Sequence, residues 1–365
     1  MSAWNRWKLL WAYLRGSDDV RALPVEYIVE TTARCNIYCP MCPRETHPQP
    51  KEDMDEAVFR KLLDESACTA EHMMLIGLGE PLLDRRIFDR IHACAEHGIS
   101  ALISTNGTLL DERAAARLLD TPLSHITLSF DGYSKETFEF YRKGAKFERV
   151  RDNFVRFCRM KHERGSRLQV TVQMVRMEGN RHEEDAFRRF WRGVPGVDLI
   201  RVKDDETNLL GGGAERRTGH PCHYLWRGAM YVKHNGDVYP CCQSYMLDGE
   251  PVGNLSGQSL AEIFNGEPMR RMRRVHAAGR AGEIGICAKC CTAIPHPLLA
   301  AGSLLLHGNT VRALLPWVER WSRRLFGERL LDRPVRTPPP PLVQLQPHPG
   351  TAAAERPPGP ARREP

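Results

Sequence analysis

The sequence predicts an α/β protein, a partial (β/α)6 TIM-like barrel followed by a small cysteine-rich domain. Six short apolar runs alternate with helix-like segments between residues 25 and 203, polar motifs follow four successive runs, and a second cysteine-rich segment comes after residue 209. Such alternation favours a parallel sheet with right-handed crossovers. Because six units are fewer than the eight of a closed barrel, we expect an open barrel that binds ligands at the carboxyl ends of its strands.

The six predicted strands are short runs rich in branched residues, which is typical of buried parallel strands. They are VEYIVETT, HMMLIGL, ISALIST, HITLSF, LQVTVQMV and VDLIRVK. The predicted helices between them include MDEAVFRKLLDES, RRIFDRIHACAEHG, DERAAARLLD and FERVRDNFVRFCRMKHERG. The last of these repeats its apolar residues at helical spacing and ends at Gly165, a residue type that often stops a helix.

Motifs that carry chemistry follow the first four predicted strands. A cysteine loop follows the first strand, and GLGEP (77–81), STNG (104–107) and SFDG (129–132) follow the next three. Since the carboxyl ends of parallel strands lie at one edge of a barrel, the four motifs should converge on one rim. Glycines there would let the backbone approach a ligand closely.

The cysteine loop holds Cys35, Cys39 and Cys42 within eight residues. The apolar run 9–14 is too short for a signal peptide, and no run reaches the roughly 18 apolar residues of a membrane span. We therefore expect a cytoplasmic protein whose clustered cysteines bind metal. Three thiolates can hold a four-iron cube and leave one iron open to a ligand. A structural zinc site with His47 as the fourth ligand is the alternative.

The C-x3-C-x2-C spacing and GLGEP together resemble the radical S-adenosylmethionine (SAM) superfamily, from about Pro24 to Cys291. The resemblance implies a [4Fe–4S] cluster that binds SAM and cleaves it reductively to a 5′-deoxyadenosyl radical. It assigns the cluster to Cys35, Cys39 and Cys42, the SAM ammonium to Gly77, Gly79 and Glu80, and the ribose and carboxylate end of SAM to Ser104, Asn106 and Ser129. Met41 departs from the family, in which an aromatic residue is common at that position.

A second cysteine set resembles the SPASM/Twitch extension of the same superfamily, in its form with one auxiliary [4Fe–4S] cluster. Cys222 is followed by thirteen residues, Gly236, four residues and Cys241, and a C-x2-C pair follows at Cys287 and Cys290. The resemblance implies that Cys222, Cys241, Cys287 and Cys290 hold this cluster, with Cys242 and Cys291 as spare thiols. A zinc ribbon is the alternative for this set.

The sequence divides into five segments. They are an N-terminal amphipathic helix (1–23), the radical SAM core (24–208), the auxiliary-cluster domain (209–295), amphipathic basic helices (296–335) and a disordered proline-rich tail (336–365). One face of the first helix carries Trp4, Trp7, Trp11 and Leu14, and a similar face carries Leu314, Trp317, Trp321 and Leu325. Such faces suit a peripheral membrane contact or packing on the protein itself. The net charge of +7 is modest, and its basic clusters are more simply explained as solvated helix faces than as a nucleic acid site, so no nucleic acid partner is expected.

The sixth predicted strand ends in a charged stretch, RVKDDETN (201–208). Alternation along that strand would turn Lys203 toward the barrel interior, where it could act as a catalytic base or bind an anionic substrate group. A solvated loop is the alternative for these charges.

The substrate follows less directly from the sequence. Similarity to cyclitol-oxidising members of the superfamily favours dehydrogenation of a sugar or cyclitol. Many peptide maturases carry a peptide-binding domain before the first strand, and the roughly 24 residues here are too few for one. The alternatives are a peptide-modifying radical SAM maturase and, in another class, a zinc-stabilised binding protein. A reducing donor such as flavodoxin or ferredoxin would supply electrons.

Overall fold

The computed structural model describes residues 3–45, 50–205, 220–246, 249–290 and 297–306. Its strands are β1 (Glu26–Val29), β2 (His72–Met74), β3 (Ser100–Thr105), β4 (His125–Ser129), β5 (Gln169–Arg176), β6 (Leu199–Asp204), β7 (Gly228–Val232), β8 (Asp237–Tyr239) and β9 (Gly253–Asn254). They form one sheet in the order β6-β5-β4-β3-β2-β1-β7-β8-β9.

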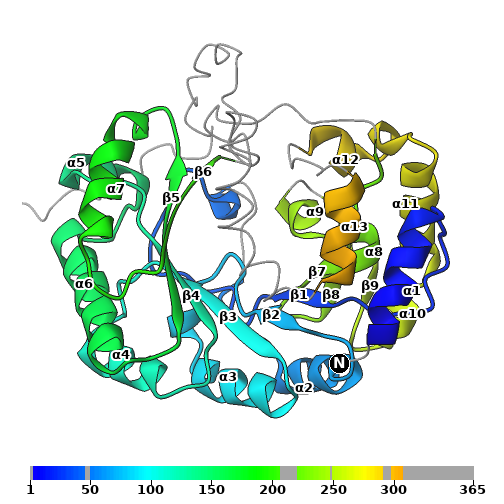
Figure 1. Cartoon of the computed structure of the whole chain (residues 1–365), viewed down its shortest axis with the longest axis horizontal. Coiled ribbons are helices and arrows are strands. Elements are labelled where there is room, and N and C mark those ends of the chain that lie inside the picture. The colour runs from blue at the N-terminus through cyan, green and yellow to red at the C-terminus, as the bar shows by residue number, and fades with distance from the viewer. Residues whose placement is uncertain (1–2, 46–49, 206–219, 247–248, 291–296, 307–365) are drawn as a thin grey trace, which may run out of the picture.

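Helices cover the outer face of this curved sheet (Figure 1). The helices are α1 (Ala3–Leu14), α2 (Glu56–Ser66), α3 (Ile87–Glu96), α4 (Glu112–Leu119), α5 (Lys135–Tyr141), α6 (Phe147–Glu163), α7 (Glu184–Arg192), α8 (Tyr224–Arg227), α9 (Cys242–Met246), α10 (Leu260–Phe264), α11 (Glu267–Ala277), α12 (Gly285–Lys289) and α13 (Pro297–Leu305). Short 3-10 turns are η1 (Pro43–Glu45), η2 (Pro81–Leu83), η3 (Arg181–Glu183) and η4 (Ala281–Glu283).

The predicted open barrel is confirmed by strands β1 to β6. All neighbouring pairs among these six strands are parallel, and at least one helix lies between each strand and the next. Local sequence starts several of the helices, since Asp55, Asp111 and Ser134 each accept a hydrogen bond from a backbone N–H in the first turn of α2, α4 and α5. The polar motifs therefore lie on the carboxyl rim, as their positions predict.

The cysteine-rich segment extends this sheet instead of forming a separate layer. Strand β7 pairs in parallel with β1, and β8 and β9 continue the sheet in antiparallel fashion. A register shift next to Glu26 allows the pairing, and Gly228, with φ of +111°, is required there because a Cβ would lie 2.7 Å from Pro24 Cβ. All five residues of β7 are buried. The segment with the second cysteine set is thus joined to β1, the strand that precedes the first set.

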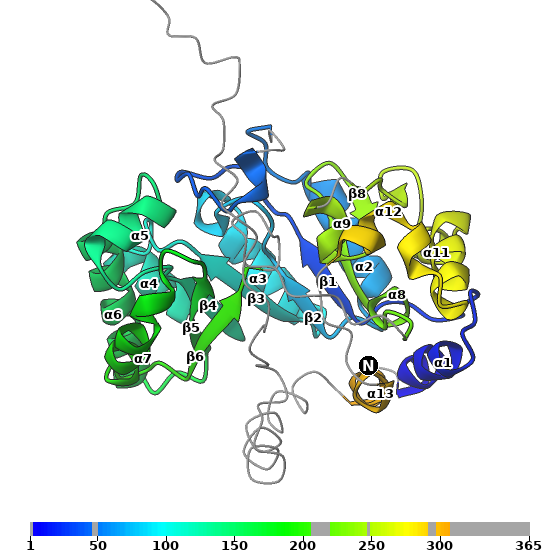
Figure 2. The same cartoon turned by 90° about the horizontal axis from the view of Figure 1, so that it is seen from above.

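The N-terminal helix is shorter than the predicted segment 1–23 and is fixed to the body of the protein. Its inner face buries Leu9, Leu10 and Tyr13, and α1 packs beside α13 in both views (Figures 1 and 2). Arg6 donates to the carbonyls of Leu304 at 2.9 Å and Leu306 at 2.7 Å.

Several sequence-based expectations fall on residues that the structure does not describe. The predicted linker at 209–219, most of the basic segment 296–335, the tail 336–365 and the second tryptophan face at 314–325 lie outside the described residues. Within the described part of that basic segment, α13 is apolar and carries no basic residue. Among the helices that are described, none is long and apolar enough to cross a membrane.

Candidate functional site

The loop after β1 brings three thiols together at the rim. Cys35, Cys39 and Cys42 are all half-buried. Burial raises the pKa of the Cys39 thiol to about 12, and the neighbouring thiols of Cys42 and Cys35 act in the same direction, while the positive charge of Arg142 opposes them. Burial also raises the pKa of Cys42. Three thiols that influence one another in this way suit a shared soft metal group, which would remove their protons on binding.

The GLGEP loop lies against the backbone that leads into the cysteines. A Cβ on Gly79 would lie 2.0 Å from the carbonyl oxygen of Thr32, and the next backbone N–H, that of Glu80, donates to Arg34 O at 2.8 Å. A Cβ on Gly77 would lie 2.5 Å from Glu30 Cγ. Both glycines are therefore needed for close packing of the two loops, in addition to the ligand contact that the sequence predicts for them.

Glu80 connects this loop to the loop after β3. Its carboxylate is buried and accepts hydrogen bonds from Thr105 Oγ1 at 2.6 Å, Asn106 N at 2.7 Å and Leu82 N at 3.2 Å. Burial raises the pKa of Glu80, and these bonds oppose the rise. The predicted ammonium ligand therefore also joins two of the rim motifs.

The other predicted SAM contacts lie on the same rim. Asn106 directs its amide toward the cysteine loop, with Nδ2 at 3.0 Å from Asn36 Oδ1 and 3.9 Å from Cys35 Sγ. The hydroxyls of Ser104 and Ser129 are 3.1 Å apart at the ends of β3 and β4. The structure thus brings these three side chains to one edge of the sheet.

Arg142, which lies beside the cysteine loop, was not identified as a site residue from the sequence. Arg142 forms an ion pair with Asp131, with 2.7 Å between Nε and Oδ2, and the same carboxylate accepts from Val175 N at 2.7 Å. Its charge favours the thiolate forms of Cys39 and Cys42. Asp131 belongs to the SFDG motif, but Arg142 lies just after α5 in a stretch without a motif. A fixed cation at this point can also attract a carboxylate of a ligand.

Glu30, buried at the end of β1, is a second group that the sequence analysis missed. Its carboxylate accepts from Tyr231 Oη at 2.9 Å and from Leu78 N at 3.3 Å, and it lies 2.9 Å from His234 Nδ1. Leu78 is in the GLGEP loop, whereas Tyr231 and His234 come from the cysteine-rich segment. Glu30 therefore joins the two halves of the chain.

Apolar packing continues this connection. Tyr231 and Tyr239 form a small buried cluster with Ile28 and Leu78, and the two tyrosine rings meet edge to face with 6.3 Å between their centroids. Tyr239 ends β8, two residues before Cys241. Contacts thus run from the GLGEP loop to the strand that leads into Cys241.

The second set gathers around one pocket. Cys222, Cys241, Cys287 and Cys290 all line it, together with apolar side chains that include Leu225, Met272 and Ile286. Burial raises the pKa of Cys222 to about 12 and that of Cys241 to about 11. Four soft sulfur donors in an apolar enclosure fit a fully ligated iron–sulfur cube. Cys242 is not among the described lining residues, and Cys291 lies outside the part of the chain that is described.

His276 lies against this pocket and contacts two of the cysteines. The backbone N–H of Cys222 donates to Nδ1 at 3.3 Å, and Nε2 lies 3.3 Å from Cys287 Sγ. Because Nδ1 accepts, the proton of the neutral ring is on Nε2, which donates to the sulfur.

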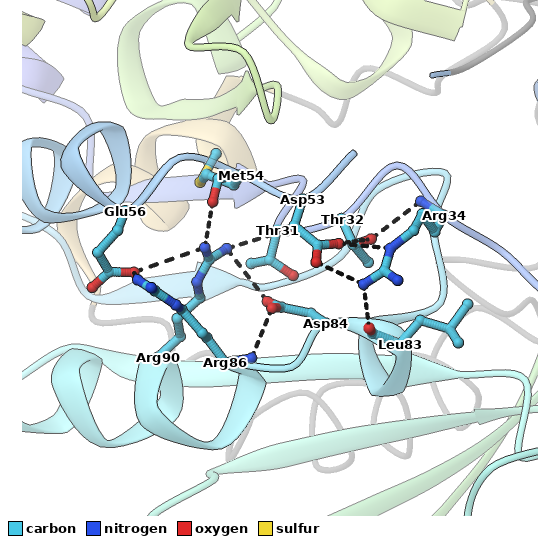
Figure 3. Close-up of polar contacts among 10 residues, drawn as sticks. All are labelled: Thr31, Thr32, Arg34, Asp53, Met54, Glu56, Leu83, Asp84, Arg86 and Arg90. Carbon is cyan, nitrogen blue, oxygen red and sulfur yellow. Dashed lines mark hydrogen bonds and ion pairs between the residues drawn. The ribbon is translucent and has the colours of Figure 1, made fainter. Parts of the chain in front are cut away.

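A buried arginine, Arg90, contacts the chain that follows β1 and precedes the cysteines (Figure 3). Arg90 donates to the carbonyls of Thr31 at 3.2 Å and Met54 at 2.6 Å, and it pairs with Asp84 at 3.3 Å. Burial lowers the pKa of Arg90 against the effect of the neighbouring carboxylates. The guanidinium thereby fixes the residues that follow β1 to the start of α2.

A second arginine acts closer to the cysteines. Arg34 donates to Asp53 Oδ1 at 2.9 Å and to the carbonyl of Leu83 at 2.6 Å, and Thr32 donates to the same Asp53 oxygen at 2.7 Å (Figure 3). Since Arg34 directly precedes Cys35, these bonds fix the entry into the cysteine loop.

Lys203, the predicted base, lies half-buried on β6, the edge strand of the sheet. Val202 is buried in the core, whereas Arg201 is exposed. Four strands separate β6 from β1, so Lys203 lies on the far side of the open barrel from the cysteine loop. Asp205 is buried, and Glu206 lies outside the described residues.

Comparison with known proteins agrees with these two sites. Residues 29–190 match the Radical SAM superfamily, and residues 222–291 match SPASM, an iron–sulfur cluster-binding domain. The chain is 33% identical over 290 residues to the tungsten-containing aldehyde ferredoxin oxidoreductase cofactor-modifying protein of Pyrococcus furiosus, covering 66% of this chain and 80% of that protein. It is 24% identical to the PqqA peptide cyclase of Xanthomonas campestris pv. campestris, covering 91% of this chain and 96% of the relative.

A solved structure shares the fold. Native anSMEcpe with bound AdoMet aligns with a TM-score of 0.55 at 16% identity, covering 83% of this chain and all of the other. The chain belongs to the radical SAM superfamily and carries a SPASM domain. It is an enzyme that uses [4Fe–4S] clusters and S-adenosylmethionine. Family membership excludes the zinc-stabilised binding protein that the sequence left open.

The buried contacts of Arg90 give a first prediction. Replacing Arg90 with Met should lower the free energy of unfolding by about 3–5 kcal/mol, because Asp84 would remain buried without its charged partner. The matched control is Arg86→Ala, which removes a largely exposed arginine that pairs with Glu56 at 3.1 Å and should cost about 0–1 kcal/mol. Anaerobic denaturant titration measures both, and equal losses would contradict the assigned role of Arg90.

Proposed function

We propose that this enzyme removes a hydrogen atom from its substrate at the rim of the barrel. One electron of the resulting substrate radical would then pass to an auxiliary cluster held by the second cysteine set. Cys35, Cys39 and Cys42 would hold the SAM-binding cluster. Cys222, Cys241, Cys287 and Cys290 would hold the auxiliary cluster. The observation that carries the proposal is the packed connection from Leu78 through Glu30 and Tyr231 to Tyr239, because it joins the GLGEP loop to the strand that leads into Cys241.

The bound groups would supply the radical chemistry. The first cluster and SAM would supply a 5′-deoxyadenosyl radical, and the second cluster would accept one electron. The chain's own residues would position and shield these groups. Backbone carbonyls of the GLGEP loop and Glu80 would bind the SAM ammonium, and Arg142 would attract its carboxylate. Ser104, Asn106 and Ser129 would contact the ribose and carboxylate end. Loss of one hydrogen atom, one electron and one proton makes the net reaction a two-electron oxidation.

Lys203 is proposed as the group that takes the proton. It lies half-buried on β6, next to the buried Val202. A flavodoxin or ferredoxin is proposed as the external electron donor.

We propose a peptide as the substrate class. The similarity to PqqA peptide cyclases supports it, since it extends over nearly the whole of that relative. The sugar or cyclitol favoured by the sequence, and a small cofactor of the kind named in the Pyrococcus furiosus relative, are the alternatives.

Removal of the first thiol set tests the proposed radical site. The triple substitution of Cys35, Cys39 and Cys42 by Ala should abolish formation of 5′-deoxyadenosine from SAM under dithionite. It should also lower the iron content of the reconstituted protein from about eight to about four per chain, because the second set remains. The matched control replaces Cys94, a buried core thiol, with Ala and should retain both clusters. Persistent 5′-deoxyadenosine formation in the triple variant would disprove the assignment.

Lys203→Ala tests the proposed base and the substrate class together. The enzyme is incubated anaerobically with SAM and a panel of peptides, cyclitols and amino sugars, and products are screened for a loss of two hydrogens by mass spectrometry. The variant should lose product while uncoupled SAM cleavage persists, because the base acts after hydrogen abstraction. Arg201→Ala, which removes an exposed cation from the same strand, is the control. Wild-type product levels in the Lys203 variant would exclude it as the base, and a cyclitol product would replace the peptide proposal.

The hydrogen bond from His276 should raise the reduction potential of the auxiliary cluster. A donor to a ligand sulfur stabilises the reduced, more negative state. His276→Leu should therefore lower the potential by about 40 mV, the one-electron equivalent of about 1 kcal/mol, in an EPR-monitored redox titration. His276→Gln retains an N–H donor and should recover part of the shift. An unchanged potential in the Leu variant would show that the histidine only fills space.

A further inference from the structure

The outer face of α1 presents an apolar stripe to solvent. Its four large side chains are 66%, 55%, 55% and 59% exposed and belong to Trp4, Trp7, Trp11 and Leu14. Their spacing places them along one side of the helix. Exposed apolar side chains are common singly, but a contiguous stripe with three tryptophans marks an interaction surface.

The stripe is held in a fixed orientation, because the opposite face of α1 is anchored. Asn5 exchanges two hydrogen bonds with the backbone of Leu23, at 2.8 and 3.0 Å. Arg6 forms an ion pair with the buried Glu71, and the ring of Tyr13 meets that of Trp226 edge to face at 5.5 Å. The helix therefore cannot turn its tryptophans inward without breaking a buried ion pair.

Positive charge accompanies the stripe. Lys8 Nζ lies 5.8 Å from the ring centroid of Trp4, and the guanidinium carbon of Arg15 lies 4.3 Å from that of Trp11. Residues 3–16 contain no acidic side chain, and the next acids in the chain, Asp18 and Asp19, form ion pairs with arginines of α11. The outer face of α1 thus combines apolar side chains with charges that are all positive.

The neighbouring helix α13 also ends in exposed apolar side chains. The end of α13 packs beside α1, and Leu305 and Leu306 are 39% and 41% exposed. Figures 1 and 2 show the two helices together at the periphery of the molecule, far from α5 and α7 on the other side of the barrel.

We propose that the outer face of α1 docks on the surface of an anionic phospholipid membrane. Tryptophan favours the boundary between headgroups and acyl chains, and nearby lysine and arginine are attracted to anionic lipid. A symmetric second copy fits less well, because a two-fold contact through this face would bring Lys8 and Arg15 against the same cations of the other chain. This inference is independent of the proposed reaction.

Vesicle sedimentation of the full-length holoprotein tests the proposal. The wild-type protein should co-sediment with vesicles of phosphatidylcholine and phosphatidylglycerol at low salt, bind pure phosphatidylcholine more weakly, and lose affinity as salt screens the charges. Combined substitution of Trp4, Trp7 and Trp11 by Ala should reduce binding to the anionic vesicles at least tenfold. Phe140→Ala, which removes an aromatic side chain of similar exposure from α5, should leave binding unchanged.

A second variant separates loss of the surface from loss of fold. Lys8→Glu combined with Arg15→Glu should weaken binding to anionic vesicles while the circular dichroism and SAM cleavage remain those of the wild type. Failure of the wild-type protein to bind anionic vesicles at low salt would overturn the proposal. A wild-type dimer that the tryptophan substitutions convert to a monomer would also overturn it, by assigning the face to a second copy.

Discussion

The rim of this enzyme depends on one buried charge, the guanidinium of Arg90. It donates to two backbone carbonyls, those of Thr31 and Met54, while its charge is balanced by Asp84. Outside regular secondary structure, backbone carbonyls need donors from elsewhere in the chain. Arg90 supplies them from α3, and Arg34 fixes the next turn of the loop through Asp53. The chain that leads into the thiols is therefore held by side-chain contacts from Arg90 and Arg34.

The second constraint is the pairing of β7 with β1. It places the SPASM segment on the same sheet as the radical SAM core, and Gly228 permits it where a larger residue would collide with Pro24. Through this pairing, Tyr231 and His234 reach the carboxylate of Glu30, which also contacts the GLGEP loop. The GLGEP loop and the SPASM segment are thus joined by direct contacts through Glu30.

The buried ionic groups described at the rim all have partners. The Asp131–Arg142 pair keeps a cation beside the thiols, and the buried carboxylate of Glu80 joins two of the rim loops. Both are buried ionic groups that would be costly without their partners, and their hydrogen bonds are satisfied by backbone N–H groups and hydroxyls.

The sequence by itself determined the open barrel, the cysteine spacings and the order of the rim motifs. These features are encoded locally, in the two-residue and 3.6-residue periodicities and in short spacings that a single loop must satisfy. It also predicted that Trp4, Trp7 and Trp11 share a face. Only the tertiary structure decided that this face is exposed, that Arg142 and Glu30 belong to the site, and that β7 joins β1. Those outcomes depend on contacts between residues far apart in the chain, such as Glu30 and Tyr231, which no local pattern specifies because the partners are chosen by packing and burial of charge.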